Sequence, residues 1–127
     1  MNTYSIVLAD DHAMLRQGLK RILEERHDLK VTGETGDGLE LLDLVNELKP
    51  HLVVLDISMP NIRGIEAIHE IRRIHPGIKI LMLTMHNDEE YLYQALSAGA
   101  DGYLLKEDAD RELFSAVDKV RRGEIFI

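Results

Sequence analysis

Three short runs of uninterrupted apolar residues stand out along the chain, at residues 6–9, 52–55 and 80–83. Runs of this kind are typical of β-strands that are covered on both faces of a sheet. Two weaker runs, at residues 30–35 and 102–105, predict two further strands. Their lower apolar content indicates strands at the edges of the same sheet.

Between these runs, apolar residues recur at helical spacing. The spacing predicts five helices, over residues 14–23, 41–48, 65–74, 88–97 and 113–120. Pro76-Gly77 is expected to end the third helix, and Gly99 to cap the fourth. Strand and helix thus alternate five times. Short right-handed connections then favour an α/β fold, a doubly wound five-stranded parallel sheet with helices on both faces.

Length and composition narrow the class of protein. The chain has 127 residues, enough for one domain over residues 1–127, and is 45% hydrophobic and 30% charged. Its net charge of -8 argues against direct binding to nucleic acid, because phosphates repel an acidic surface. It contains no cysteine, and no apolar stretch approaches the ~20 residues of a membrane span. We therefore expect a soluble, cytoplasmic protein with no membrane partner.

Polar residues follow four of the predicted strands. Asp10 and Asp11 follow the first strand, Asp56 the third, Thr84 the fourth and Lys106 the fifth. An aspartate after a strand is often only a helix cap or a turn residue. Parallel sheets, however, bind ligands at the carboxyl ends of their strands, so the whole set predicts a site at that edge.

Three clustered carboxylates need a cation. Two unit charges ~4 Å apart repel by roughly 4 kcal/mol at an effective dielectric constant near 20. Lys106 alone cannot neutralise Asp10, Asp11 and Asp56, and oxygen ligands without cysteine favour Mg²⁺ over zinc. A carboxylate beside Mg²⁺ and an ammonium group is placed to attack phosphorus. Our hypothesis is that Asp56 carries a phosphoryl group.

The residues that carry this hypothesis also resemble a known family. Asp10-Asp11 and the stretches VVLDISMP, MLTMH and DGYLLK resemble the receiver domain of bacterial two-component response regulators. The stretch LTMHNDEEYLYQALSAGADGYLLK is similar to the LuxR-type (NarL/FixJ) subfamily. The resemblance covers nearly the whole chain. It implies the flavodoxin-like (βα)5 receiver fold with strand order 2-1-3-4-5, and this order comes from the family and not from the residue pattern.

The resemblance also implies roles for individual residues. Asp56 would be the phosphoacceptor, and Thr84 and Lys106 would contact the phosphoryl group. Tyr103 would be the switch aromatic that moves with Thr84, the alternative being a half-buried strand tyrosine. The implied Mg²⁺ ligands are Asp10, Asp11, Asp56 and the backbone carbonyl of Ser58.

The same resemblance implies partners. A cognate sensor histidine kinase would donate the phosphoryl group, and phosphorylation would favour a homodimer. DNA would be bound only through a helix-turn-helix output domain beyond this chain. The domain would be a transcription-regulating phosphoprotein that catalyses only its own phosphotransfer and dephosphorylation.

Several residues depart from the family pattern or leave alternatives open. Glu107 follows Lys106 where many receivers have a proline after a cis bond, and a cis bond before another residue costs ~3 kcal/mol. Met85 is larger than the residue often found after the threonine. Ser58 and His86 stand where the family tunes phosphoryl lifetime. His12 is either a further ligand or, as we favour, a residue that caps or packs the first helix.

Two other functions remain open. A haloacid-dehalogenase-like phosphatase also has an aspartate after an apolar strand, but it would have a second acid where Ser58 stands. A pseudo-receiver would keep the fold as a binding module without accepting phosphate. Such domains usually lack an acid, the acceptor or the lysine, and this chain has all of them.

Overall fold

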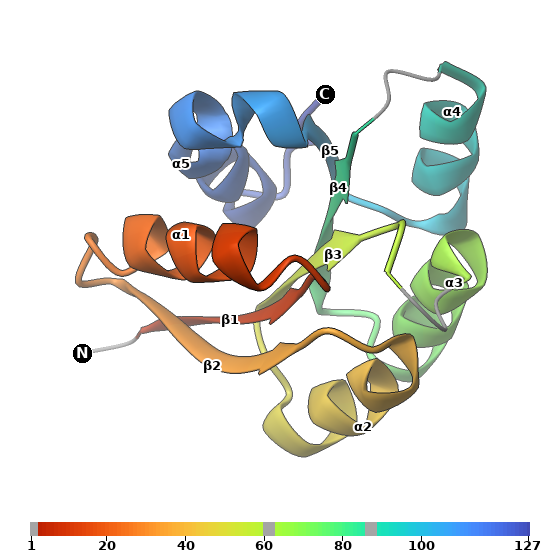
Figure 1. Cartoon of the computed structure of the whole chain (residues 1–127). Coiled ribbons are helices and arrows are strands. Elements are labelled where there is room, and N and C mark those ends of the chain that lie inside the picture. Colours follow the sequence, from red (N-terminus) through yellow and green to blue (C-terminus); the bar gives the residue numbers. More distant parts are fainter. Residues whose placement is uncertain (1–2, 60–62, 86–88) are drawn as a thin grey trace.

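The computed structural model describes residues 3–59, 63–85 and 89–127. Within them, strands and helices alternate as the sequence predicts (Figure 1). The strands are β1 (Tyr4–Ala9), β2 (Leu29–Thr35), β3 (Leu52–Asp56), β4 (Lys79–Thr84) and β5 (Gly102–Leu105). The helices are α1 (Ala13–Leu23), α2 (Gly38–Leu48), α3 (Gly64–Ile74), α4 (Glu89–Ala98) and α5 (Ala109–Arg121), with a 3-10 turn, η1 (Lys106–Asp108), before α5.

The five strands form one parallel sheet in the order β2-β1-β3-β4-β5, which confirms the predicted topology. The chain starts near the middle, runs to one edge and then returns across β1 to the other edge. The two weak apolar runs are the two edge strands, β2 and β5. The order reverses between β1 and β3, which places the carboxyl ends of these two strands side by side.

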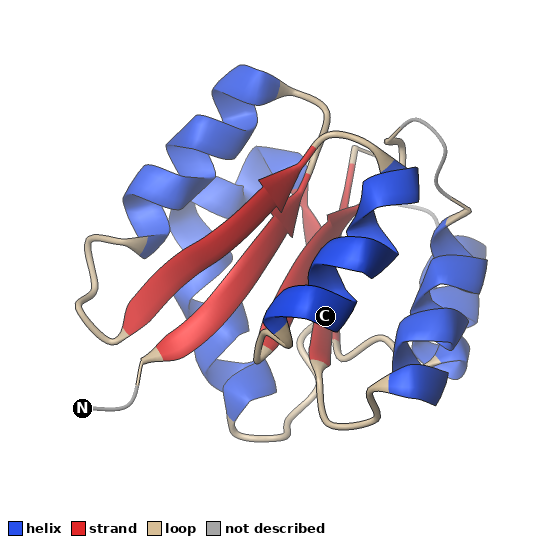
Figure 2. Ribbon diagram, turned by 90° about the horizontal axis from the view of Figure 1, so that it is seen from below, coloured by secondary structure: helices blue, strands red, loops and turns tan. Residues whose placement is uncertain are grey.

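Helices cover both faces of the sheet (Figures 1 and 2). Because side chains alternate along a strand, Ile6 and Leu8 point to one face and Val7 and Ala9 to the other. The first face packs against α1 and α5, and the second against α2, α3 and α4. The uninterrupted apolar run of β3 therefore contributes to two cores at once, and all five residues of β3 are buried.

The boundaries differ from the predicted ones mainly where the first turns of helices are polar. Helix α5 begins at Ala109, four residues before the apolar spacing becomes visible at Leu113. The first residue of the predicted fourth helix, Asp88, lies outside the described residues. Gly99 follows α4 with a φ of 115°, a left-handed conformation that favours glycine. All peptide bonds of the described residues are trans, including the bond between Lys106 and Glu107.

The chain after α5 returns to the sheet. Phe126 forms an isolated parallel bridge with Gly102, and its carbonyl accepts a hydrogen bond from the backbone N–H of Tyr103 at 2.9 Å. The outer edge of β5 is thus partly covered by the last residues, which the apolar pattern did not predict. None of the helices in the described ranges is long and apolar enough to pass through a lipid bilayer.

Candidate phosphoacceptor site

The first two acids leave the sheet at the end of β1. The backbone N–H of Asp10 donates to the carbonyl of Thr35 at 2.9 Å, so Asp10 stays held against β2. Its side chain is buried, whereas Asp11 is exposed. Arg16 of α1 donates from Nη1 to the carbonyl of Asp10 at 2.5 Å. These bonds orient Asp10 inward and leave Asp11 facing solvent.

Asp56 is the last residue of β3 rather than the residue that follows it. Its side chain is fully buried, because β3 lies between β1 and β4 and Asp56 pairs in register with Leu83. Oδ1 of Asp56 accepts two hydrogen bonds from Ser58, one from the backbone N–H at 2.9 Å and one from Oγ at 2.8 Å. Ser58 therefore fixes the orientation of the buried carboxylate, a role that the sequence did not predict.

Lys106 reaches the acids from the end of β5, which lies on the opposite side of β3 from β1. It is the first residue of η1, directly after β5, and its side chain is only 5% exposed. Its Nζ donates to Oδ2 of Asp56 at 2.9 Å and lies 3.4 Å from Oδ2 of Asp10. The predicted convergence of Asp10, Asp56 and Lys106 is thus present in the fold.

The two buried carboxyl groups have opposite pKa shifts. Burial raises the pKa of Asp10, and the nearby charge of Asp56 raises it further, against the backbone hydrogen bond from His12 and the attraction of Lys106. Burial also acts to raise the pKa of Asp56, but the hydrogen bonds from Ser58 and Lys106 outweigh it, so that pKa is lowered. The lysine charge therefore stabilises mainly Asp56 in its ionised form.

Thr84 and Tyr103 lie on the neighbouring strands. Thr84, the last residue of β4, is buried and pairs in register with Leu105. Tyr103, on β5, is also buried and belongs to the core that faces α4. Thr84 thus lies at the same carboxyl end of the sheet as Asp56. Tyr103 lies on the adjacent strand, two residues before Leu105, the register partner of Thr84.

His12 does not cap α1 through its side chain, which was one part of the interpretation that we favoured. It occupies the N-cap position, but its side chain makes no capping hydrogen bond. The ring instead turns toward the acids, with Nδ1 3.2 Å from Oδ1 of Asp10 and 3.5 Å from Oδ1 of Asp11. The only indication of this in the sequence is the position of His12 directly after the acid pair.

The acids and His12 fit a divalent cation. Asp10, Asp11, His12 and Asp56 each offer a ligand atom, and these atoms all lie within 4.8 Å of one another. Oδ2 of Asp10 is buried without a hydrogen bond, although it lies in ion-pair range of Lys106. A buried oxygen of this kind normally has a partner, which a metal ion would supply.

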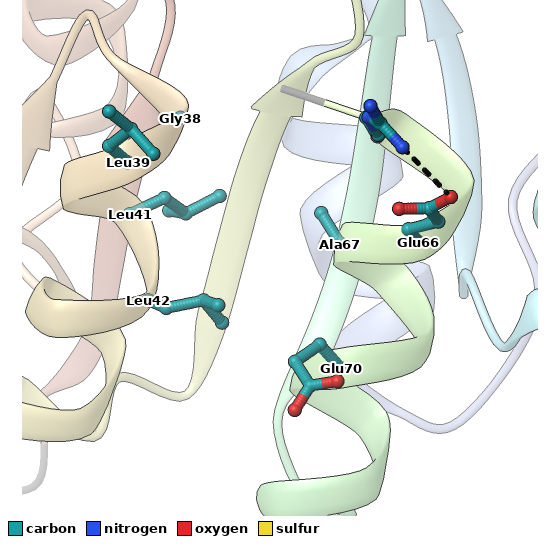
Figure 3. Close-up of a pocket in the computed structure, with 8 residues that line it drawn as sticks. Gly38, Leu39, Leu41, Leu42, Glu66, Ala67 and Glu70 are labelled. Atoms are coloured by element: carbon teal, nitrogen blue, oxygen red, sulfur yellow. Dashed lines mark ion pairs between the residues drawn. The ribbon is translucent and has the colours of Figure 1, made fainter. Parts of the chain in front are cut away.

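A separate groove lies between α2 and α3 (Figure 3). It has a volume of about 440 Å³ and is lined by leucines of α2, by Arg63 just before α3, and by Glu66 and Glu70 of α3. Arg63 pairs with Glu66 at 3.7 Å in this groove. None of the lining residues belongs to the acid site, so the groove is not part of the candidate phosphoacceptor site.

Comparison with known proteins agrees with this fold. The sequence profile of the response regulator receiver domain matches residues 6–118. The oxygen regulatory protein NreC of Staphylococcus epidermidis is 43% identical over 123 residues, which are 96% of this chain and 56% of NreC. The chain spans little more than half the length of the curated relatives that it matches.

Solved structures give the same result. A LuxR-family two-component response regulator from Aurantimonas superposes with a TM-score of 0.93 at 35% identity, covering 99% of this chain and 90% of that one. The non-phosphorylated receiver domain of the stress response regulator RcsB from Escherichia coli superposes with a TM-score of 0.91 at 31% identity, covering 98% of each chain. The protein therefore belongs to the response regulator receiver domain family. Within it, the relatives and structural neighbours place the chain in the LuxR-type branch of two-component response regulators.

Proposed function

We propose that Asp56 is the residue of this receiver domain that accepts the phosphoryl group. The observation that carries the proposal is the pairing of a fully buried carboxylate with a buried ammonium group, at 2.9 Å between Asp56 Oδ2 and Lys106 Nζ. The pKa of Asp56 is lowered, so its carboxylate is ionised and nucleophilic at neutral pH. Ser58 holds its other oxygen in one orientation.

In the proposed reaction, a carboxylate oxygen of Asp56 attacks the phosphorus of a phosphohistidine in the sensor kinase. The new P–O bond forms as the P–N bond breaks, and the kinase imidazole leaves with the electron pair and takes up a proton. Lys106 would exchange its contact with Asp56 for one with the phosphoryl oxygens, and its charge would stabilise them. Thr84, at the same edge, would donate its hydroxyl hydrogen to a phosphoryl oxygen.

The metal in this proposal is Mg²⁺, held by Asp10, Asp11, Asp56 and the carbonyl of Ser58. When bound, the ion would neutralise charge on the phosphoryl oxygens in the transition state. The chain's own contribution is the placement of its ligands. Asp10 is fixed by β2 and Arg16, and its orphaned oxygen fits a metal ligand. Asp11 is open to solvent, which leaves a path for the ion.

Phosphorylation would change the surface formed by α4, β5 and α5. The phosphoryl group adds charge and acceptor oxygens at the sheet edge. Thr84 would move toward them, and Tyr103 would shift with it as the switch aromatic. A difference of a few kcal/mol between two arrangements is enough for such a population shift.

Beyond the domain, we propose the partners that the family suggests. They are a cognate sensor histidine kinase, a second copy of the chain after phosphorylation, and DNA through a helix-turn-helix output domain. A structure of RcsB from Salmonella enterica was determined with the protein bound to a promoter, and promoter binding is a property of that RcsB protein. We also propose that the receiver domain spans residues 1–127 and that the protein is cytoplasmic.

The domain would act as a signalling switch, with no reaction on substrates other than its own phosphoryl group. The haloacid-dehalogenase-like alternative would have an acid at position 58 as a proton donor. Here Ser58 donates to Asp56, which supports an acceptor role rather than turnover. The pseudo-receiver alternative is disfavoured because Lys106 lies within ion-pair distance of both Asp10 and Asp56.

The test is incubation with acetyl phosphate and Mg²⁺, followed by intact mass spectrometry. The wild-type chain should gain the mass of one phosphoryl group, and the Asp56→Asn variant should gain none. A matched control is Asp43→Asn, which removes an exposed acid of α2. No gain in the wild type would favour the pseudo-receiver, and continuous release of phosphate from a generic phosphate ester would favour the phosphatase.

A further inference from the structure

We propose that His12 is a nitrogen ligand for a divalent transition-metal ion at the acid site. The site would then take such an ion through three carboxylates and one imidazole, in addition to Mg²⁺ through oxygen alone. The inference rests on the proposed function, since it concerns the metal that assists phosphoryl transfer to Asp56.

The position of the imidazole is the first argument. Nδ1 of His12 lies 3.2 Å from Oδ1 of Asp10, 3.5 Å from Oδ1 of Asp11 and 4.0 Å from Oδ2 of Asp56. Around a six-coordinate ion with bonds of about 2.1 Å, neighbouring ligands are about 3.0 Å apart and opposite ligands about 4.2 Å apart. The distances of 3.2 and 4.0 Å lie close to these two values and that of 3.5 Å lies between them, so Nδ1 and the acids could ligate one ion after small side-chain movements.

The hydrogen-bonding pattern is the second argument. Nδ1 of His12 lies 3.1 Å from Nζ of Lys106, which can only donate, and 3.2 Å from Oδ1 of Asp10, which as a carboxylate can only accept. A single nitrogen holds either a proton or a lone pair. With Oδ1 of Asp10 already accepting the backbone N–H of His12 at 2.8 Å, Nδ1 can present its lone pair toward Lys106. A cation at this point would bind the lone pair of Nδ1 and the carboxylate oxygens together.

The third argument combines the buried Asp10 carboxylate with the exposure of the His12 side chain. Oδ2 of Asp10 is buried without a hydrogen bond, and the ammonium group of Lys106 lies 3.4 Å from it. The His12 side chain is 58% exposed and is not used to cap α1. It therefore lies at the solvent side of the acids, where an entering ion would meet it before reaching Asp10.

The donor set indicates the class of ion. Mg²⁺ prefers oxygen ligands, whereas imidazole suits nickel and zinc, and affinity rises from Mn²⁺ to Ni²⁺. Adding one nitrogen to three carboxylates should therefore strengthen binding of Ni²⁺ much more than binding of Mg²⁺.

The test uses the whole chain with Mn²⁺ as a spectroscopic probe. Pulsed EPR of the Mn²⁺-loaded protein should show hyperfine coupling to an imidazole ¹⁴N, and His12→Asn should remove it. Asparagine suits an N-cap position, so α1 should remain intact in this variant. The control is His27→Asn, which removes an exposed histidine between α1 and β2, at the opposite edge of the sheet, and should keep the coupling.

Calorimetric titration gives a second readout. His12→Asn should lower the affinity for Ni²⁺ about tenfold or more and that for Mg²⁺ less than about threefold. Absence of ¹⁴N coupling, coupling that survives in His12→Asn, or equal losses for both ions would overturn the inference. If the coupling is absent but acetyl phosphate and Mg²⁺ still add a phosphoryl group, only the role of His12 fails. If the coupling is present but no phosphoryl group is added, the proposed function fails and the role of His12 stands.

Discussion

Lys106 and Asp56 lie 50 residues apart in the chain, and their side chains meet at 2.9 Å with both almost fully buried. The sequence neighbours of these two residues do not bring their charges together. Asp56 ends a strand that is buried on both faces, and Lys106 begins the turn after an edge strand. A buried ion pair contributes little net stability, but removing one partner leaves an uncompensated charge.

Removing the lysine should therefore destabilise the protein strongly. We expect Lys106→Met to lower the free energy of unfolding at pH 7 by about 3 kcal/mol, because Asp56 and Asp10 lose their shared cation. The loss should shrink near about pH 3, where both carboxyl groups are protonated in the unfolded chain. Urea denaturation at both pH values measures this. The control Lys20→Met breaks a partly exposed pair with Glu34 and should cost less than about 1 kcal/mol.

Removing one buried acid should have the opposite effect. The pKa of Asp10 is raised in the fold, so its ionisation opposes folding as pH rises above the unfolded pKa. We expect Asp10→Asn to stabilise the metal-free protein by roughly 1 to 2 kcal/mol at pH 7 and to have little effect near about pH 3. The pKa of Asp56 is lowered, so its contribution to stability is present at neutral pH and is lost as pH falls.

Mg²⁺ should make the wild type more stable than Asp10→Asn, which reverses their order of stability in the metal-free state. A ligand that binds only the folded state raises stability with its concentration. The wild type should therefore gain more from Mg²⁺ than Asp10→Asn, in thermal unfolding with and without the ion. Equal gains for the two proteins would show that Asp10 is not a ligand.

Much of the fold and of the site could be predicted from the sequence, because buried strands and paired acids leave strong local patterns. The runs at β1, β3 and β4 are apolar on both faces, and the acids that follow them are unusual neighbours for such runs. The first turn of α5 and the bridge at Phe126 were missed, since polar residues and an isolated bridge leave no periodic signal. The orientation of His12 could not be predicted either, because it depends on contacts between three segments distant in sequence.

Coupling between Thr84 and Tyr103 can be tested by NMR. We expect phosphorylation to shift the ring resonances of Tyr103, and Thr84→Val to reduce that shift while leaving a phosphoryl group on Asp56. The reason is that valine keeps the shape of threonine but cannot donate a hydrogen bond. Tyr93, which is 73% exposed on α4, serves as an internal control. A Tyr103 response that is the same in both proteins would contradict the switch.

The turn after α4 should be sensitive to substitution. Gly99 has a φ of 115°, and a Cβ added there would lie 3.1 Å from Nε of Arg72. We expect Gly99→Ala to destabilise the protein by about 1 to 2 kcal/mol. Gly77→Ala is the matched control, because a Cβ there meets nothing within 4 Å and no positive φ is involved. Chemical denaturation compares the two, and equal costs would contradict the explanation.

The most direct measurement locates the phosphoryl group itself. An acyl phosphate on an aspartate is reduced by borohydride to homoserine, which peptide mass spectrometry can place in the chain. After treatment with acetyl phosphate and Mg²⁺, our account predicts homoserine at position 56 alone. Homoserine at position 10 or 11, or a phosphoryl group found on His12, would contradict it.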